Sequence, residues 1–164
     1  MLEERDVDAL QDLVESDPGY TERVTGYPPG PSDALSLLLI RPEGVEEDAK
    51  VVFGAFEDEH LVAVLDVLRG YPDAARAFVG LLLVRGDRQG RGIGRWAVEE
   101  LLAGMPREWP EVQRLRLAVV DTNAAVAGFW ARLGFEATGE ERPYRYDHLE
   151  SVTRLFERPV ARER

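Results

Sequence analysis

Apolar and polar residues alternate with helical spacing near the start of the chain and with strand spacing further along. Residues 6–15 carry an apolar stripe at helical spacing, and Asp6 is the expected N-cap. The next segment, residues 17–31, is rich in proline and glycine, which predicts a loop or a broken helix. A short apolar helix is then expected from Ser32 to about Ile40.

The next apolar segments have the length and composition of strands. Residues 50–57 and 61–69 predict two strands, and the short polar segment between them is typical of a hairpin turn. Residues 75–84 are apolar nearly throughout, which predicts a central strand that is buried on both faces.

Helices and strands alternate in the second half. Apolar residues at helical spacing follow Ile93, and Gly104 and Pro106 are expected to end that helix. Residues 114–120 predict a strand. Residues 123–133 then predict a helix that stops at a glycine.

Two closing strands are expected at 135–140 and 151–158. The middle order is strand, strand, strand, helix, strand, helix, strand. It predicts an α/β fold with a mixed sheet and helices packed on it. At 164 residues, the chain is expected to form a single domain spanning residues 1–164.

Composition narrows the function. The formal net charge of −11 argues against general nucleic-acid binding, which needs a basic face. The sequence contains no run of about 18 apolar residues, so no membrane span is predicted. The acidic first residues do not resemble a signal peptide. We therefore expect a cytoplasmic protein with no membrane partner. The sequence is compatible with a homodimer.

Metal chemistry is not expected. The chain has no cysteine, which excludes disulfides, thiolate metal sites and cysteine nucleophiles. Its two histidines, His60 and His148, lie far apart in the sequence, so we expect no metal site.

The segment VRGDRQGRGIGRW, residues 84–96, concentrates glycine and arginine between the third predicted strand and a helix. A helix N-terminus leaves backbone N–H groups unpaired and carries a partial positive charge. Glycines allow a ligand to approach that backbone closely, and Arg88, Arg91 and Arg95 add charge. The segment therefore predicts a site for a phosphate or pyrophosphate.

Two other phosphate-binding motifs fit less well. A P-loop requires Gly-Lys-Ser/Thr after its glycines, and this chain has Gly-Arg-Trp. Gly92, Gly94 and Ala97 match the Rossmann pattern G-x-G-x-x-A, with Asp121 as a ribose-binding acid. However, the glycines begin six residues after Val84, and further strand–helix units are absent. A dinucleotide enzyme stays the weaker alternative.

Two motifs resemble those of the GCN5-related N-acetyltransferases. Residues 89–94 match the family signature Q/R-x-x-G-x-G/A, and residues 123–135 resemble N-x5-F-Y-x3-G-F. The resemblance covers about residues 50–140. It implies a mostly antiparallel twisted sheet with a splayed strand pair, and acetyl-CoA as co-substrate. The acceptor would be an amine of a small molecule or peptide.

The resemblance also assigns coenzyme-binding roles. Backbone groups of Leu82, Leu83 and Val84 would pair with the pantetheine arm, and one N–H could polarise the thioester carbonyl. Asn123 would bond the pantetheine, although it also suits a helix N-cap. Phe129 would pack beside the coenzyme, or serve as a core aromatic. The expected pyrophosphate-binding residues are Arg88, Gln89, Gly90, Arg91, Gly92, Ile93, Gly94 and Arg95.

The general base is harder to assign. Asp66 is the only acid within the strand 61–69, and burial would raise its pKa. Asp66 is therefore the first candidate, although it also suits a structural hydrogen-bond acceptor or an anchor for the acceptor amine. Glu57 and Asp121, at strand ends, are weaker candidates. A chain of water molecules could also serve.

The residue at the position of the family's general acid departs from the family pattern. The family commonly has tyrosine where this chain has Trp130, and an indole N–H cannot transfer its proton near neutral pH. Tyr144 is the preferred substitute and Tyr146 the second, although both also suit partly buried sheet aromatics. The missing tyrosine leaves a second hypothesis open, a non-catalytic module that senses acyl-CoA.

Overall fold

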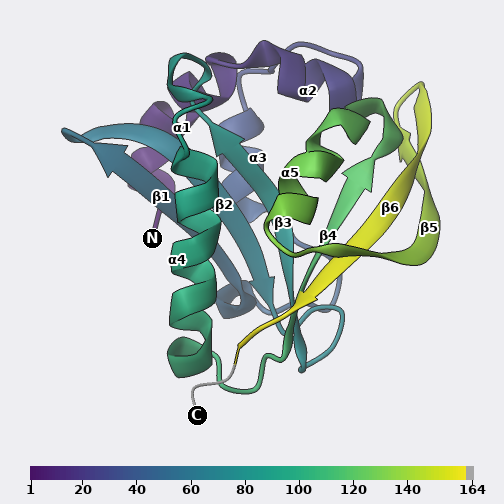
Figure 1. Cartoon of the computed structure of the whole chain (residues 1–164). Coiled ribbons are helices and arrows are strands. Elements are labelled where there is room, and N and C mark those ends of the chain that lie inside the picture. Colours follow the sequence, from purple (N-terminus) through teal and green to yellow (C-terminus); the bar gives the residue numbers. More distant parts are fainter. Residues whose placement is uncertain (162–164) are drawn as a thin grey trace.

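The computed structural model describes residues 1–161 and contains a six-stranded sheet (Figure 1). The strand order is β1-β2-β3-β4-β6-β5, and β3–β4 is the parallel pair among otherwise antiparallel neighbours. The strands are β1 (Lys50–Glu57), β2 (His60–Arg69), β3 (Arg76–Val84), β4 (Arg114–Val120), β5 (Glu136–Tyr146) and β6 (Leu149–Pro159). This arrangement confirms the predicted mixed sheet.

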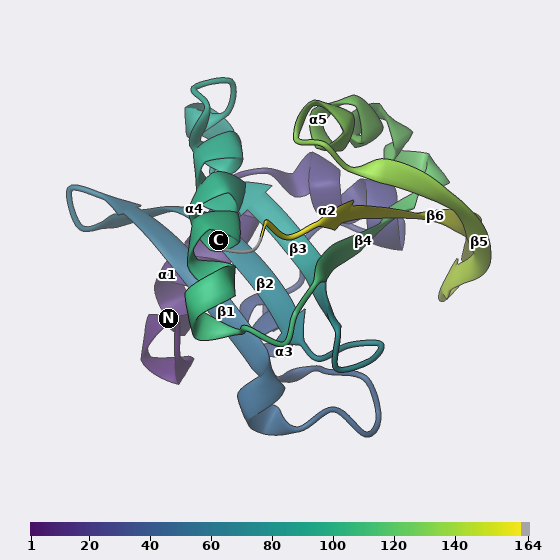
Figure 2. The ribbon, with the colours of Figure 1, turned by 60° about the horizontal axis from the view of Figure 1, so that its bottom comes forward.

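Helices cover both faces of the sheet (Figure 2). The helices are α1 (Val7–Glu15), α2 (Pro18–Thr25), α3 (Asp33–Leu39), α4 (Ile93–Glu108) and α5 (Ala127–Arg132). Successive side chains of β2 point to opposite faces of the sheet, so the core has two parts, one on each face. Val64 packs with Leu10 of α1 on one face, whereas Leu65 packs with Val98 of α4 on the other.

The parallel strands β3 and β4 pair over only four residues each. Residues 76–79 of β3 pair with residues 114–117 of β4. Beyond them the two strands diverge, as Figure 1 shows. A β-bulge lies at this point, because Asp66 pairs with Leu81 and Val67 pairs with Val79, which leaves Gly80 as the extra residue. The splayed strand pair implied by the resemblance is therefore present.

The divergence corrects the prediction that β3 is buried on both faces. Several residues of β3 are only partly buried, and Gly80 is exposed. The second half of β3 is apolar because its side chains pack against helices on both faces, although its free edge borders an open cleft.

The predicted end of the helix after Ile93 was wrong. Helix α4 passes through Gly104 and Pro106 and ends at Glu108. Met105 is 1% exposed, and the Trp109 N–H donates to its carbonyl over 2.8 Å. Burial of Met105 therefore helps to hold the last turn, to which Pro106 contributes no N–H.

Two further segments combine a short helix with non-helical backbone: residues 17–31, predicted as a loop or a broken helix, and residues 123–133, predicted as one helix. Residues 17–31 contain helix α2, which ends at Gly26 in the left-handed region with φ +81°. The predicted helix 123–133 begins instead as a 3₁₀ segment, η4 (Asp121–Val126), before α5. Asn123 interrupts the helical geometry there with φ −118°.

A buried ion pair joins β1 to β2 on the face covered by α1. The Lys50 Nζ lies 2.9 Å from each carboxylate oxygen of Asp66. Only 6% of the Lys50 side chain and 12% of the Asp66 side chain are exposed. Burial raises the pKa of Asp66 above its ordinary value, and the attraction of Lys50 opposes that rise.

We expect Lys50→Met to destabilise the protein in a pH-dependent way. Removing one partner leaves a buried unpaired carboxylate, at a cost of about 3–5 kcal/mol near neutral pH. Because the folded-state pKa of Asp66 is raised, its contribution to stability falls as pH rises through that pKa. Urea unfolding should therefore show a smaller loss under acidic conditions than near neutral pH.

The double variant Lys50→Met/Asp66→Asn is the matched control. It carries no buried charge at this position, so it should recover part of the lost stability and show a weaker pH dependence. An equal loss for Lys50→Met at both pH values would contradict this account of the pair.

Candidate functional site

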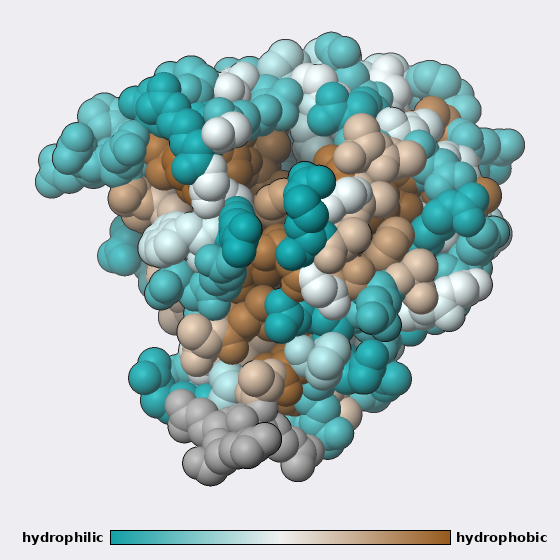
Figure 3. All heavy atoms as spheres, in the orientation of Figure 1, coloured by the Kyte–Doolittle hydropathy of each residue, from teal (hydrophilic) through white to brown (hydrophobic). Residues whose placement is uncertain are grey.

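The divergence of β3 from β4 opens a cleft of about 740 Å³. Its walls come from α2, the second half of β3, the turn before α4, the end of β4, and the segment η4–α5. Figure 3 shows apolar residues in the hollow between polar rims. The cleft combines a free strand edge with a helix N-terminus.

The turn at the start of α4 exposes its backbone. Gly90 and Gly92 have φ of +74° and +81°, and a Cβ at either position would meet no atom within 4 Å. No side chain among residues 1–161 caps α4, and the first helical hydrogen bond of α4 runs from the Trp96 N–H to the Gly92 carbonyl. The N–H groups of the first helical turn before Trp96 therefore lack helical partners, which favours an anionic ligand.

The arginines of this turn are largely paired with acids. Arg88 lies 2.8 Å from Glu57 and 3.2 Å from Asp87. Arg95 is 2.7 Å from Glu99, and Arg91 is exposed outside the lining of the cleft. These acids reduce the positive potential that the arginine count predicts, so the backbone is the main electropositive feature of the turn.

Side-chain contacts hold the turn against its neighbours. The Gln89 Nε2 donates to the Val84 carbonyl over 3.1 Å and to the Asp17 carboxylate over 2.9 Å. At Gly94, a Cβ would lie 3.3 Å from Val84 Cγ2 and 3.6 Å from Phe129 Cζ. Glycine at position 94 therefore lets α4 approach β3 and α5 closely.

The three predicted strand residues place their backbone along the cleft. Leu82 and Val84 point toward Gly94 on the α4 face, and Leu83 packs in the core on the α1 face. No residue of β4 pairs with this part of β3. Backbone groups on that edge are therefore available to an extended ligand, as in strand addition.

Asn123 contacts the N-terminal part of the chain. Its side chain is 8% exposed, and its Oδ1 accepts a hydrogen bond from Arg23 Nε over 2.8 Å. Neither η4 nor α5 has a side-chain cap, so the N-cap alternative for Asn123 is not observed. Arg23 is not predicted from the sequence, because a contact across 100 positions leaves no local signal.

Aromatic residues form the α5 wall of the cleft. Trp130 is 6% exposed and packs edge to face against Phe129 and Phe135, with ring centroids 5.0 Å and 5.2 Å apart. Both Phe129 and Trp130 line the cleft and also contact the core. The two alternatives considered for Phe129, cleft wall and core aromatic, therefore coexist.

Two tyrosines line the cleft near α2. The Tyr144 hydroxyl donates to the Val24 carbonyl over 2.5 Å, and burial raises its pKa. Burial, with the nearby Tyr144, also raises the pKa of Tyr20 to about 12, against the opposing charge of Arg23. Both phenols are therefore neutral at physiological pH.

Asp66 lies beneath the cleft and is not part of its lining. A Cβ at Gly80 would lie 2.7 Å from the Asp66 Oδ2, so only glycine separates the carboxylate from the cleft floor. The other two acids considered as bases are engaged on the surface. Glu57 pairs with Arg88, and Asp121 lies 2.9 Å from Arg154.

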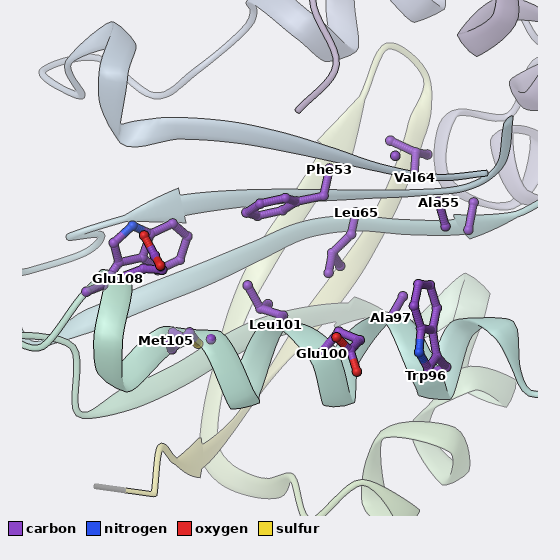
Figure 4. Close-up of a pocket in the computed structure, with 14 residues that line it drawn as sticks. Phe53, Ala55, Val64, Leu65, Trp96, Ala97, Glu100, Leu101, Met105 and Glu108 are labelled. Atoms are coloured by element: carbon purple, nitrogen blue, oxygen red, sulfur yellow. The ribbon is translucent and has the colours of Figure 1, made fainter. Parts of the chain in front are cut away.

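A second cavity, of about 310 Å³, separates α4 from β1 and β2 (Figure 4). Small residues on both sides, including Ala55, Ala63 and Gly104, leave this space unfilled. Trp96 and Glu100 project from α4 along it. None of the predicted site residues lines this cavity, so it is separate from the cleft.

Residues 1–161 contain neither a candidate metal site nor a helix that could span a membrane. No group of three or more histidine, aspartate or glutamate side chains there is arranged to hold a metal ion. Over the same residues, every helix is too short or too polar to span a bilayer.

Solved structures of acetyltransferases share this fold. An acetyltransferase from Thermus thermophilus is 29% identical, with a TM-score of 0.73, covering 95% of this chain and 92% of that one. The ribosomal-protein-S18-alanine N-acetyltransferase of Escherichia coli is 19% identical, with a TM-score of 0.69 and coverage of 99% and 93%. A GCN5-related N-acetyltransferase from Kribbella flavida is 20% identical, with a TM-score of 0.68 and coverage of 97% and 95%.

A family model identifies the chain more directly. No curated protein sequence matched. The model of the acetyltransferase (GNAT) family matches residues 9–135, which includes the N-terminal helices as well as both motifs. The chain therefore belongs to the acetyltransferase (GNAT) family.

Proposed function

We propose that this protein transfers an acetyl group from acetyl-CoA to a primary amine of a small molecule or peptide. The observation that carries the proposal is the free edge of β3, which continues into the uncapped N-terminus of α4. A ligand with an extended arm that ends in a pyrophosphate would match both features, with the arm along the strand edge and the pyrophosphate at the helix N-terminus. Acetyl-CoA supplies the thioester, and the amine displaces its thiol.

The residues around the cleft suit the coenzyme. The β3 edge at Leu82, Leu83 and Val84 would pair with the pantetheine amides. Gly90, Gly92 and Gly94 leave the space that the phosphates require. The remaining proposed coenzyme contacts are Arg88, Gln89, Arg91, Ile93, Arg95, Asn123, Phe129 and Trp130.

We assign proton transfer to Asp66 and Tyr144. We propose Asp66 as the general base, acting across Gly80, because burial already raises its pKa. The proposed proton donor is Tyr144, a residue that lines the cleft and whose hydroxyl donates to the Val24 carbonyl. Trp130 provides shape and hydrogen-bonding capacity, since an indole N–H is not an acid near neutral pH.

One observation supports the alternative of a non-catalytic acyl-CoA sensor. Within residues 1–161, Asp17 is the only carboxylate among the residues that line the cleft, and it accepts a hydrogen bond from Gln89. A sensor would bind acetyl-CoA without releasing its thiol in the presence of amines, so the two functions separate in one assay.

We expect acetyl-CoA to stabilise the folded protein. At about 100 times its dissociation constant, a ligand that binds only the folded state adds roughly 2.7 kcal/mol to the free energy of unfolding. Thermal melts with acetyl-CoA and with NAD measure this effect. Incubation with a panel of amines should then release free thiol. No shift with acetyl-CoA, or a larger shift with NAD, would contradict the proposal.

The second prediction concerns the glycine turn. Gly92→Glu should abolish coenzyme binding, because it adds bulk and negative charge where the phosphates are proposed to lie. Since Gly92 has a positive φ, we also expect a stability loss of about 1–2 kcal/mol. Calorimetry measures binding and circular dichroism measures folding.

Gly104→Glu is the matched control. It adds the same charge to the far end of α4, where a Cβ would meet no atom within 4 Å. Binding should be unchanged in this variant. Full coenzyme affinity in a folded Gly92→Glu variant would mean that the phosphates bind elsewhere.

The third prediction concerns the proton donor. Tyr144→Phe should lower turnover on the order of 10²-fold, because general acid catalysis is typically worth 10²- to 10⁴-fold. Coenzyme affinity should be preserved. Trp130→Tyr restores a phenol where the family commonly has one, so we expect it to recover part of the loss in the Tyr144→Phe background. Unchanged turnover in Tyr144→Phe would contradict the proposed proton donor. The Tyr144 hydroxyl would then have only a structural role, as the donor to the Val24 carbonyl.

A further inference from the structure

Arg23 lies at the end of the cleft where α2 meets η4. Its Nε donates to Asn123 Oδ1 over 2.8 Å, which fixes the orientation of the guanidinium. Its Nη1 lies over Gly19, where a Cβ would be 3.1 Å away. Arg23 is an exposed residue that lines the cleft. The Nη groups are therefore positioned to meet a ligand.

Arg23 differs from the other cationic residues of the cleft in its partners. Arg88 pairs with Glu57 and Asp87, and Arg95 pairs with Glu99. Within residues 1–161, Arg23 forms no ion pair, and its hydrogen bond goes to a neutral amide. Its charge is therefore not neutralised by an adjacent carboxylate.

Among the neighbouring groups, none within residues 1–161 forms an ion pair with Arg23. Tyr20 and Tyr144 have raised pKa values and stay neutral. Asp66 is paired with Lys50. A Cβ placed on Gly19 would lie 3.1 Å from the Arg23 Nη1 and 3.5 Å from the Asp17 Oδ1, so Asp17 is a near neighbour of Arg23, although the two form no ion pair. This end of the cleft therefore combines a cation with neutral hydrogen-bonding groups and one nearby carboxylate that does not contact it.

A guanidinium with a free pair of Nη groups is suited to a carboxylate, which it binds through two parallel hydrogen bonds. We propose that Arg23 binds a carboxylate of the acceptor, so that the acceptor is an amino acid and not a simple amine or a polyamine. The inference rests on the proposed acetyl transfer and names the substrate class of the same cleft. An amino acid is also a zwitterion, and the net charge of −11 would repel it less than a polyanion.

The coenzyme phosphates are the competing partner for Arg23. They are expected at Gly90–Gly94, where the α4 N-terminus offers its own N–H groups. Arg23 instead lies near Tyr20, and its hydrogen bond goes to Asn123, which is proposed to contact the pantetheine arm and not the phosphates. A measurement of coenzyme affinity separates the two assignments.

The test compares amino acids with the amines that remain when their carboxylate is removed. The pairs are alanine and ethylamine, leucine and isoamylamine, phenylalanine and phenethylamine, and lysine and cadaverine. Wild-type protein should prefer the amino acid in at least one pair by about tenfold or more in kcat/KM. Arg23→Gln should lower that kcat/KM about 10- to 100-fold, mainly through KM.

Three comparisons make the result specific. Arg23→Gln keeps an amide N–H that can donate to Asn123. The kcat/KM for the paired amine and the dissociation constant of acetyl-CoA should therefore both stay unchanged within about twofold, a difference below 0.5 kcal/mol. Arg23→Lys keeps the charge without the fork, so it should recover part of the loss. Arg107→Gln, at the exposed C-terminal end of α4, is the control for a lost surface charge and should behave as wild type.

A binding measurement keeps the test independent of turnover. The CoA-saturated protein is titrated calorimetrically with the same amino acids and amines. Binding of amino acids that weakens in Arg23→Gln supports the carboxylate site even without thiol release, in which case only the proposed catalysis fails. Equal losses for amino acids and amines, a weakened affinity for acetyl-CoA, or acetylation of amines with no carboxylate preference would each overturn the assignment.

Discussion

The free edge of β3 is the constraint on which the rest of the site depends. Parallel pairing with β4 stops at Val79, and backbone groups beyond it need other partners. In the open cleft, solvent or a ligand supplies the hydrogen-bond partners of these backbone groups. The bulge at Gly80 coincides with this point, and a bulge bends and twists its strand. The same feature therefore ends one strand pairing and creates the surface available to an extended ligand.

Electrostatics in this molecule is decided locally and not by net charge. The chain is strongly acidic, yet acids at the glycine turn pair with Arg88 and Arg95 and reduce their free charge. The peptide dipoles of α4 cannot be neutralised in this way, because no side chain caps the helix. Backbone geometry is thus a more dependable source of anion affinity than arginine content.

The N-terminal helices complete the cleft. α2 contributes Tyr20 and Arg23, and Arg23 contacts Asn123 directly across the cleft. At the glycine turn, Asp17 accepts a hydrogen bond from Gln89, and a Cβ at Gly86 would lie 2.2 Å from the Ser16 carbonyl oxygen. The segment that selects the acceptor in our proposal is therefore held against the segment proposed to bind the coenzyme.

The sequence by itself determined the strands, most of the helices and the glycine turn, because period-2 and period-3.6 patterns and left-handed glycines are local properties. Both family motifs were also recognisable, since they lie within short segments. Tertiary structure alone decided that Asp66 is paired with Lys50 beneath Gly80, that arginines of the turn are neutralised by acids, and that Arg23 reaches Asn123. These contacts join residues from separate elements, and their energies depend on burial and distance, which no local pattern encodes.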